Sequence, residues 1–170
     1  MKEGSEEGRA LLSKFTSFAL TTDLSMLSEN ECKMLPHLIA AGDQMEDIFW
    51  MQAYGNRDEL LDSIKDPALR EYAKLNYGPW DRIGGNISFI EGVGDKPEGS
   101  GFYPKDVSKE EFEAAAAVNP DLKGLYTMVV RDADETLRAI PYHEAFAAQM
   151  QTAADELRAA AELADDPGLK

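Results

Sequence analysis

The chain has 170 residues, of which 44% are hydrophobic and 29% are charged. This composition indicates a globular chain that can bury a core of its own, rather than a disordered or fibrous one. Asp and Glu number 32 against 17 Lys and Arg, and no basic run offsets the formal net charge of −15. Because binding to phosphates needs clustered cations, the charge argues against nucleic acid as a partner.

The sequence also lacks the features of a membrane-inserted or disulfide-bonded chain. No stretch approaches the roughly 20 consecutive apolar residues that span a bilayer, so membrane insertion is not expected. The single cysteine, Cys32, excludes an intramolecular disulfide and a cysteine-only zinc cluster. We expect a soluble chain, either cytoplasmic, or periplasmic or secreted after removal of a signal segment that this sequence does not show.

The first residues differ in composition from the rest of the chain. Residues 1–10 are polar and rich in Gly and Glu, which predicts a flexible lead. The apolar residues between Leu11 and Leu20 predict one or two turns of helix. Residues 11–170 are expected to form a single helical module.

A long amphipathic helix is predicted in the first half of the chain. It begins at a capping box, in which the Ser28 hydroxyl accepts from a backbone amide and Glu31 reaches back. Pro36 falls in its first turns, where proline is tolerated or makes a kink, and Gly55 ends it. The residues that recur at three- and four-residue spacing along it are Leu35, Leu38, Ile39, Met45, Ile48, Phe49 and Gln52.

Two shorter helices are expected next. Asn56 and Asp66 each stand where a side chain can cap the start of a helical pattern, and Asp66 is followed by a proline. Gly78 and the proline after it end the second of these helices.

The most informative stretch is a long loop predicted at residues 78–107. Glycines, prolines and aromatic residues alternate there, and a loop of this length in a compact domain is usually functional or disordered. The aromatic rings argue against disorder, because they offer apolar area to bury. The residues predicted to bind a substrate or partner are Tyr77, Trp80, Asp81, Arg82, Phe89, Glu91, Phe102 and Tyr103.

The second half of the chain predicts two helices separated by a hairpin. A capping box at Ser108 opens the first helix, and Pro141 opens a long second one. Between them, residues 126–131 and 136–140 read as two short strands joined by a tight turn. The fold class is therefore mainly α, with five or six helices and one small β-hairpin, and α+β at the margin.

No catalytic or metal site is predicted in the chain. Neither His37 nor His143 has a second metal ligand at helical spacing, since position 147 is alanine where a zincin helix would need histidine. Cys32 lies in an ordinary first turn without a neighbouring base. The glycines from Gly92 to Gly101 do not form a phosphate loop, because no helix opens behind them. No cofactor is therefore expected in this chain.

Three parts of the sequence together resemble bacterial proteins similar to dipeptidyl peptidase III, and they cover most of the chain from about Leu27 onward. The motifs combine rare residues in a fixed order, which makes the resemblance fairly specific. They are Asp47-Ile48-Phe49-Trp50 with Gln52-Ala53-Tyr54-Gly55, then Tyr77-Gly78-Pro79-Trp80-Asp81-Arg82, Phe89 to Pro97 and Phe102 to Asp106, then Ile140 to Phe146.

The resemblance implies a two-lobed zinc peptidase that removes dipeptides from peptide N-termini. The zinc site of this family uses a His-Glu-x-x-Gly-His helix and a later glutamate, which this sequence does not contain. The chain would then be the N-terminal part of a larger protein, with zinc expected only in the full-length protein. No catalytic residue of the family can be assigned to any position here.

Some relatives in that family carry a fused Nudix domain and can be labelled Nudix hydrolases. A Nudix box needs Arg-Glu followed by a pair of glutamates on one helix to hold a divalent metal. Arg70 and Glu71 are followed by Tyr-Ala-Lys, so the box is absent. We expect such a label not to describe the chemistry of this chain.

Three hypotheses for function remain open. The leading one is a non-catalytic segment of a zinc peptidase, which packs against the rest of its own polypeptide and lines part of the peptide cleft. The second is a free-standing helical module that binds a peptide or protein through the aromatic loop. The third is a small hydrolase with Asp81, Glu91 or His143 as general base. Self-association of the isolated chain would follow if it exposes a large apolar face.

Overall fold

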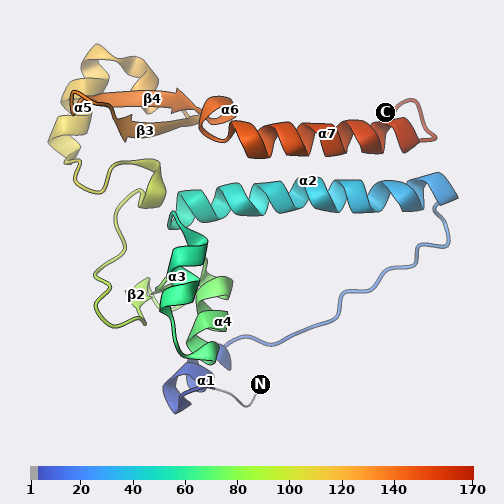
Figure 1. The fold of residues 1–170 in the computed structure, drawn as a ribbon, viewed down its shortest axis with the longest axis horizontal. Coiled ribbons are helices and arrows are strands. Elements are labelled where there is room, and N and C mark those ends of the chain that lie inside the picture. The colour runs from blue at the N-terminus through green and yellow to red at the C-terminus, as the bar shows by residue number, and fades with distance from the viewer. Residues whose placement is uncertain (1–3) are drawn as a thin grey trace. The chain divides into compact units, whose positions relative to one another are not determined.

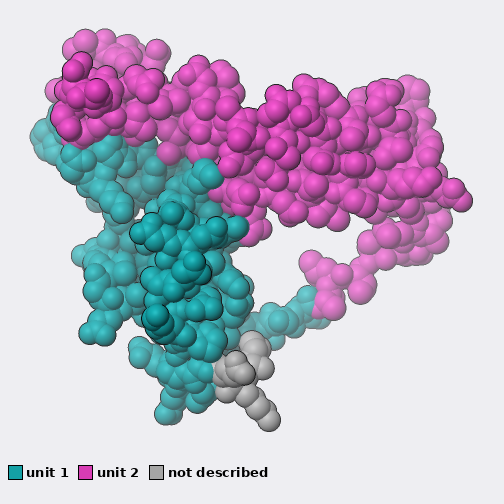
Figure 2. All heavy atoms as spheres, viewed as in Figure 1, with its two compact units in different colours: residues 1–18, 50–112 teal, residues 19–49, 113–170 magenta. Residues whose placement is uncertain are grey.

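A computed structural model describes residues 4–170 of the chain. These residues divide into two compact units, which Figure 2 distinguishes by colour. Unit 1 contains the residues up to 18 together with residues 50–112, and unit 2 contains residues 19–49 and 113–170. Helix α2 (Glu29–Ala53) contributes its last turn to unit 1 and the rest to unit 2.

Unit 1 is built from short helices with strong local caps. The Asn56 side chain accepts from the amide of residue 59 at the start of α3, and Asp66 accepts from two amides at the start of α4. Both predicted caps are thus confirmed. The structure also has a helix within the first residues, where Ser5 accepts from the Gly8 amide. The helices of unit 1 are α1 (Glu6–Leu12), α3 (Arg57–Ser63) and α4 (Pro67–Asn76).

The first helix differs from the expectation. The apolar residues between Leu11 and Leu20 were expected to form one or two helical turns, but the helix begins at Glu6 and ends at Leu12. The Ser5 cap starts it early, and the β-branched and aromatic residues that follow are weak helix formers.

The core of unit 1 lies where α3 and α4 meet the last turn of α2. Trp50, Leu60, Ile64 and Ala73 are buried there. Tyr72 is fully buried beside them and lies edge-on to Phe89, with 4.8 Å between the ring centroids. Partly buried side chains complete this core, namely Tyr54, Leu61, Leu69, Tyr77, Phe89 and Ile90.

The predicted loop at residues 78–107 contains short regular elements. Trp80 pairs with Ser88, and Asp81 with Ile87, in an antiparallel ladder of two residues a strand. A single turn of 3-10 helix follows near the end of the loop. The elements are β1 (Trp80–Asp81), β2 (Ile87–Ser88) and η1 (Ser100–Phe102).

Unit 2 contains the predicted hairpin between helices. Its strands pair antiparallel from Thr127 with Pro141 to Arg131 with Leu137, and the turn closes with a bond from the Asp132 amide to the Thr136 carbonyl. The predicted hairpin is therefore confirmed. The elements are α5 (Lys109–Val118), whose first turn belongs to unit 1, η2 (Pro120–Lys123), β3 (Thr127–Arg131), β4 (Leu137–Pro141), α6 (Tyr142–Ala145) and α7 (Ala147–Leu163).

Helices α2 and α7 run side by side in unit 2. The predicted capping box at the start of α2 is formed, because the amides of Ser28 and Glu31 each donate to the other side chain. His37 Nδ1 lies 2.6 Å from Glu156 Oε2, and Ser28 donates to Asp165 beyond the end of α7. Ala153 and Ala160 on α7 are buried.

The mainly helical fold class with a small β part is confirmed. Among the described residues there are seven α-helices and two antiparallel strand pairs. The additional strand pair is the two-residue ladder in the aromatic loop, which is too short to leave an alternation in the sequence. The long helix expected from Pro141 is interrupted at Phe146, whose backbone leaves the helical region. None of the helices in residues 4–170 is both long enough and apolar enough to cross a membrane.

Candidate functional site

The residues predicted to bind a ligand all lie in unit 1, but few of them face solvent. Trp80 and Asp81 are 8% and 6% exposed, so both belong to the interior. Arg82, Glu91 and Tyr103 are exposed. Tyr77, Phe89 and Phe102 are intermediate. Most of the aromatic side chains of the loop are therefore at least partly buried and stabilise the loop itself.

Tyr77 and Trp80 fix the start of the loop. Tyr77 ends α4 in the left-handed conformation, with φ of 52°, and its ring centroid lies 5.3 Å from that of Trp50. Trp80 packs near Tyr54 and donates its indole N–H to the Gly94 carbonyl at 2.9 Å. That bond ties the strand β1 to the far side of the loop.

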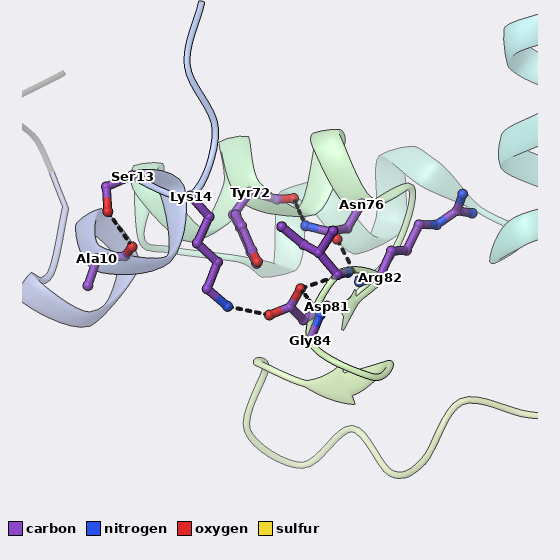
Figure 3. A network of polar contacts seen from close by, with 9 residues as sticks. Ala10, Ser13, Lys14, Tyr72, Asn76, Asp81, Arg82 and Gly84 are labelled. Carbon is purple, nitrogen blue, oxygen red and sulfur yellow. Dashed lines mark hydrogen bonds and ion pairs between the residues drawn. The ribbon is translucent and has the colours of Figure 1, made fainter.

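Asp81 is the centre of a polar network (Figure 3). Its carboxylate accepts from Lys14 Nζ at 2.5 Å and from the amides of Ile83 and Gly84 at 3.1 and 2.9 Å. Burial acts to raise the pKa of Asp81, but the hydrogen bonds outweigh it, so the pKa lies below its ordinary value. The hydrogen bond to Asp81 raises the pKa of Lys14 in turn. Both groups are charged at neutral pH.

Two neighbours of Asp81 extend this network. Asn76, which is buried, accepts from the Arg82 amide and donates to the Tyr72 carbonyl, both at 2.9 Å. The Tyr72 hydroxyl points toward Lys14 and Asp81 in Figure 3, yet it makes no hydrogen bond of normal geometry to any described residue. Burial raises the pKa of Tyr72, so the phenol is neutral. The network holds the loop in place, and its groups other than the Tyr72 hydroxyl are already hydrogen-bonded to one another.

Sequence reasoning missed Lys14 and Asn76. Lys14 is 67 residues from Asp81, and nothing in its local sequence marks it as the partner of a carboxylate in the loop. For Asn76 the sequence held one signal, namely its place in the last turn of a predicted helix. Polar side chains there commonly form hydrogen bonds to nearby backbone groups.

Two shallow hollows lie on the loop surface. The larger, of about 490 Å³, is formed by residues 85–87 and 95–100, and it includes Lys96, whose pKa burial lowers. The smaller, of about 260 Å³, lies between Glu98 and the start of α5, and it is lined by Tyr103 and Phe112. These two rings meet edge to face with centroids 5.3 Å apart. An apolar wall with polar groups around it suits a side chain of a peptide.

The catalytic candidates do not converge. Glu91 is exposed, while Asp81 is buried and already bonded to Lys14. His143 is exposed beside Glu144, and His37 bonds to Glu156 in the other unit. Cys32 is exposed. Within residues 4–170, no three His, Cys, Asp or Glu residues are grouped so that they could hold a metal ion.

Comparison with solved structures shows a close likeness in fold. The chain superposes with a TM-score of 0.87 on dipeptidyl peptidase III from Caldithrix abyssi, at 34% sequence identity over 95% of this chain and 32% of that one. Dipeptidyl peptidase III from Corallococcus sp. strain EGB gives a TM-score of 0.86 at 30% identity, over 96% of this chain and 32% of that one. The predicted resemblance is thereby confirmed: this chain is similar to about a third of these peptidase structures.

Sequence comparison adds one curated relative. Nudix hydrolase 3 from Arabidopsis thaliana is 23% identical over 94% of this chain and 28% of its own length. No family model matches the chain. The chain thus spans about a third or less of the proteins it resembles. Its sequence contains neither the His-Glu-x-x-Gly-His motif nor a Nudix box.

Proposed function

We propose that the chain is a non-catalytic N-terminal segment of a zinc peptidase similar to dipeptidyl peptidase III. Its role is to pack against the catalytic part and to line one wall of the peptide cleft. The observation that carries this proposal is a likeness in fold to two such peptidases. The likeness extends over nearly the whole of this chain and over about a third of each peptidase. The proposal places the chemistry in another part of the polypeptide, and it is supported there by the lack of the zinc motif in this sequence.

An exposed apolar stripe on α2 supports the packing role. Leu38, Met45 and Phe49 share one face of the helix with Gly42, and Met45 is 43% exposed. A Cβ at Gly42 would meet no atom within 4 Å, so the middle of the stripe faces open space. A face of this kind on an amphipathic helix is normally covered by another element.

The loop supports the second part of the role. Its buried residues, Trp80 and Asp81, keep the backbone in place, while Tyr103 lies at the rim of the smaller hollow. Binding sites are commonly surfaces of this type, in which mobile side chains stand on a rigid support. We therefore assign the contact with peptide to Tyr103 and its neighbours rather than to Trp80.

The first experiment measures whether the isolated chain is an enzyme. The purified 170-residue chain is dialysed, its zinc content is measured by mass spectrometry, and release of dipeptides from a peptide substrate is followed with and without added zinc. We expect negligible bound zinc and no release. Zinc-dependent cleavage by this chain would overturn the proposal.

The second experiment tests the packing role. The two thirds of the Caldithrix abyssi protein that this chain does not match are produced as a separate polypeptide, and binding is measured by size-exclusion chromatography. We expect Met45→Glu to weaken the complex, because it places a charge on the α2 stripe. Ile83→Glu is the matched control, since Ile83 is an exposed apolar residue of the loop and does not belong to that stripe. Equal binding by both variants would contradict the assigned face.

A second candidate function rests on the hollow beside Tyr103. The pair of Tyr103 and Phe112 could take an apolar side chain of a peptide without any other part of a peptidase. Saturable binding of a peptide by the isolated chain, lost in Tyr103→Ala and kept in Tyr126→Ala, would favour this function. Tyr126 is exposed in unit 2 and serves as the control.

A further inference from the structure

Residues 4–15 form a strap that is attached to α4 at its start and belongs to unit 1. Its helix α1 lies close against α4, because Gly8 is buried and a Cβ there would lie 3.1 Å from the Ala68 Cβ. The Asp66 carboxylate, which caps α4, also accepts from the Ser5 amide at 2.6 Å. One carboxylate therefore fixes the starts of both helices.

The other end of the strap reaches the aromatic loop. Lys14 Nζ donates to Asp81 at 2.5 Å and lies 5.9 Å from the centre of the Tyr72 ring (Figure 3). The Phe15 ring meets Tyr72 edge-on, with 5.7 Å between the centroids. The Asp81 side chain is only 8% exposed. Lys14 thus compensates a carboxylate inside the fold, where a charge without a cation is unfavourable.

The strap has little stability of its own. Helix α1 has seven residues, whereas an isolated helix in water needs roughly 12–15. Its helical form therefore depends on α4 and on the Asp66 carboxylate. Because the strap is attached at both ends, loss of its contact with α4 also weakens the contact between Lys14 and Asp81.

We propose that the strap is a latch on the loop at residues 78–107. Residues 4–15 leave α4 together, and the departure of Lys14 releases Asp81 and the turn between β1 and β2. Segments held by few contacts commonly open as one cooperative unit, at a lower free energy than the surrounding core.

The Tyr72 hydroxyl makes the open state accessible. It is buried and forms no hydrogen bond of normal geometry with any residue in the described part of the chain. A buried hydroxyl without a partner is unfavourable, and water reaches it once the strap has left. This gain offsets part of the cost of separating Lys14 from Asp81.

Opening of the latch affects more of the loop than its first turn. Trp80, next to Asp81, donates its indole N–H to the Gly94 carbonyl across the loop. A change at Asp81 is therefore passed to the far side of the loop, which leads on to the hollow beside Tyr103.

Amide hydrogen exchange, measured by NMR on the 170-residue chain, tests the latch. Lys14→Met removes the charge and keeps most of the side-chain length. We expect the Ile83 amide, which donates to the Asp81 carboxylate, and the amides of α1 to exchange at least about fivefold faster, with α3 unchanged.

Lys74→Met is the matched control, because it removes another paired lysine of unit 1, bonded to Glu71 at 2.6 Å. Equal exchange at Ile83 in both variants would overturn the latch. A rise in α3 as large as that at Ile83 would overturn it as well, because it would show general destabilisation of unit 1.

A second variant tests whether the strap moves as one piece. Gly8→Leu separates α1 from α4 without changing the loop, and Ala10→Leu is its control on the exposed face of the same helix. We expect faster exchange at Ile83 in Gly8→Leu alone. Release of α1 with unchanged exchange at Ile83 would show that the two ends open separately, which would overturn the latch. Neither experiment uses zinc or peptide, so the result leaves the proposed peptidase role untouched.

Discussion

Gly84 and Asp81 give a sharp test of the polar network in the loop. A Cβ at Gly84 would lie 2.7 Å from the Asp81 Cγ and closer still to a carboxylate oxygen. The carboxylate cannot turn away cheaply, because Lys14 and the amides of Ile83 and Gly84 hold it. We expect Gly84→Ala to lower the free energy of unfolding by about 1–3 kcal/mol, the usual cost of overpacking.

The same contacts set the cost of removing Asp81. Asp81→Ala leaves the Ile83 amide without its acceptor, which costs about 1–3 kcal/mol, whereas the Gly84 amide keeps the backbone carbonyl of residue 81. The double variant Asp81→Ala/Gly84→Ala lacks the carboxylate that the new Cβ at position 84 would meet. We therefore expect it to lower the free energy of unfolding by no more than Asp81→Ala alone. The two substitutions would then be coupled by about 1–3 kcal/mol, as neighbouring residues often are.

Urea unfolding followed by tryptophan fluorescence measures these changes directly. Both tryptophans of the chain, Trp50 and Trp80, lie in unit 1, so the signal reports on this unit. Gly94→Ala is the control, because a Cβ there meets no atom within 4 Å, and it should be close to neutral. If Gly84→Ala costs as much in the Asp81→Ala background as in the original chain, the assigned contact is wrong.

Three further predictions concern pH and packing. Hydrogen bonds from Ser5 lower the pKa of Asp66 to about 2 from 3.8, so its contribution to stability is full above pH 4 and lost as pH falls toward 2. Asp66→Asn should make the urea midpoint less dependent on pH in that window while keeping the helix cap. A pH dependence equal to that of the original chain would contradict the Asp66 assignment. Gly101→Ala should cost about 1–3 kcal/mol, because its Cβ would lie 2.6 Å from a backbone carbonyl of α2, whereas a near-neutral result would refute that close approach. Leu122→Ala should cost about 2–5 kcal/mol in unit 2, read by circular dichroism, since Leu122 is almost fully buried, and a cost below 1 kcal/mol would show that the site is not packed.

Local hydrogen bonding explains why the helix starts could be predicted from sequence. The caps at Ser28, Asn56, Asp66 and Ser108 each join groups two or three residues apart. A contact of that kind depends on the local sequence and hardly at all on the rest of the fold. The turn of the hairpin is local in the same sense, with Glu135 adopting a positive φ of 61°.

Burial in the aromatic loop depended on contacts between distant parts of the chain. The sequence identified Trp80 and Asp81 as notable residues and made both candidates for binding a substrate or partner, with a salt bridge inside the loop as the other role for Asp81. The structure places them in the interior, where Trp80 meets Tyr54 and Asp81 meets Lys14. An aromatic ring beside a charge looks the same in a sequence whether it faces solvent or the core.

The sequence by itself determined the capped helix starts at Ser28, Asn56, Asp66 and Ser108 and the hairpin, because each depends on neighbouring residues. Only the tertiary structure decided which side chains are covered. It left the Leu38–Met45 stripe of α2 exposed, although its apolar pattern resembles that of a buried element. Periodicity shows that a face can be buried, but the surface that covers it must come from elsewhere in the fold.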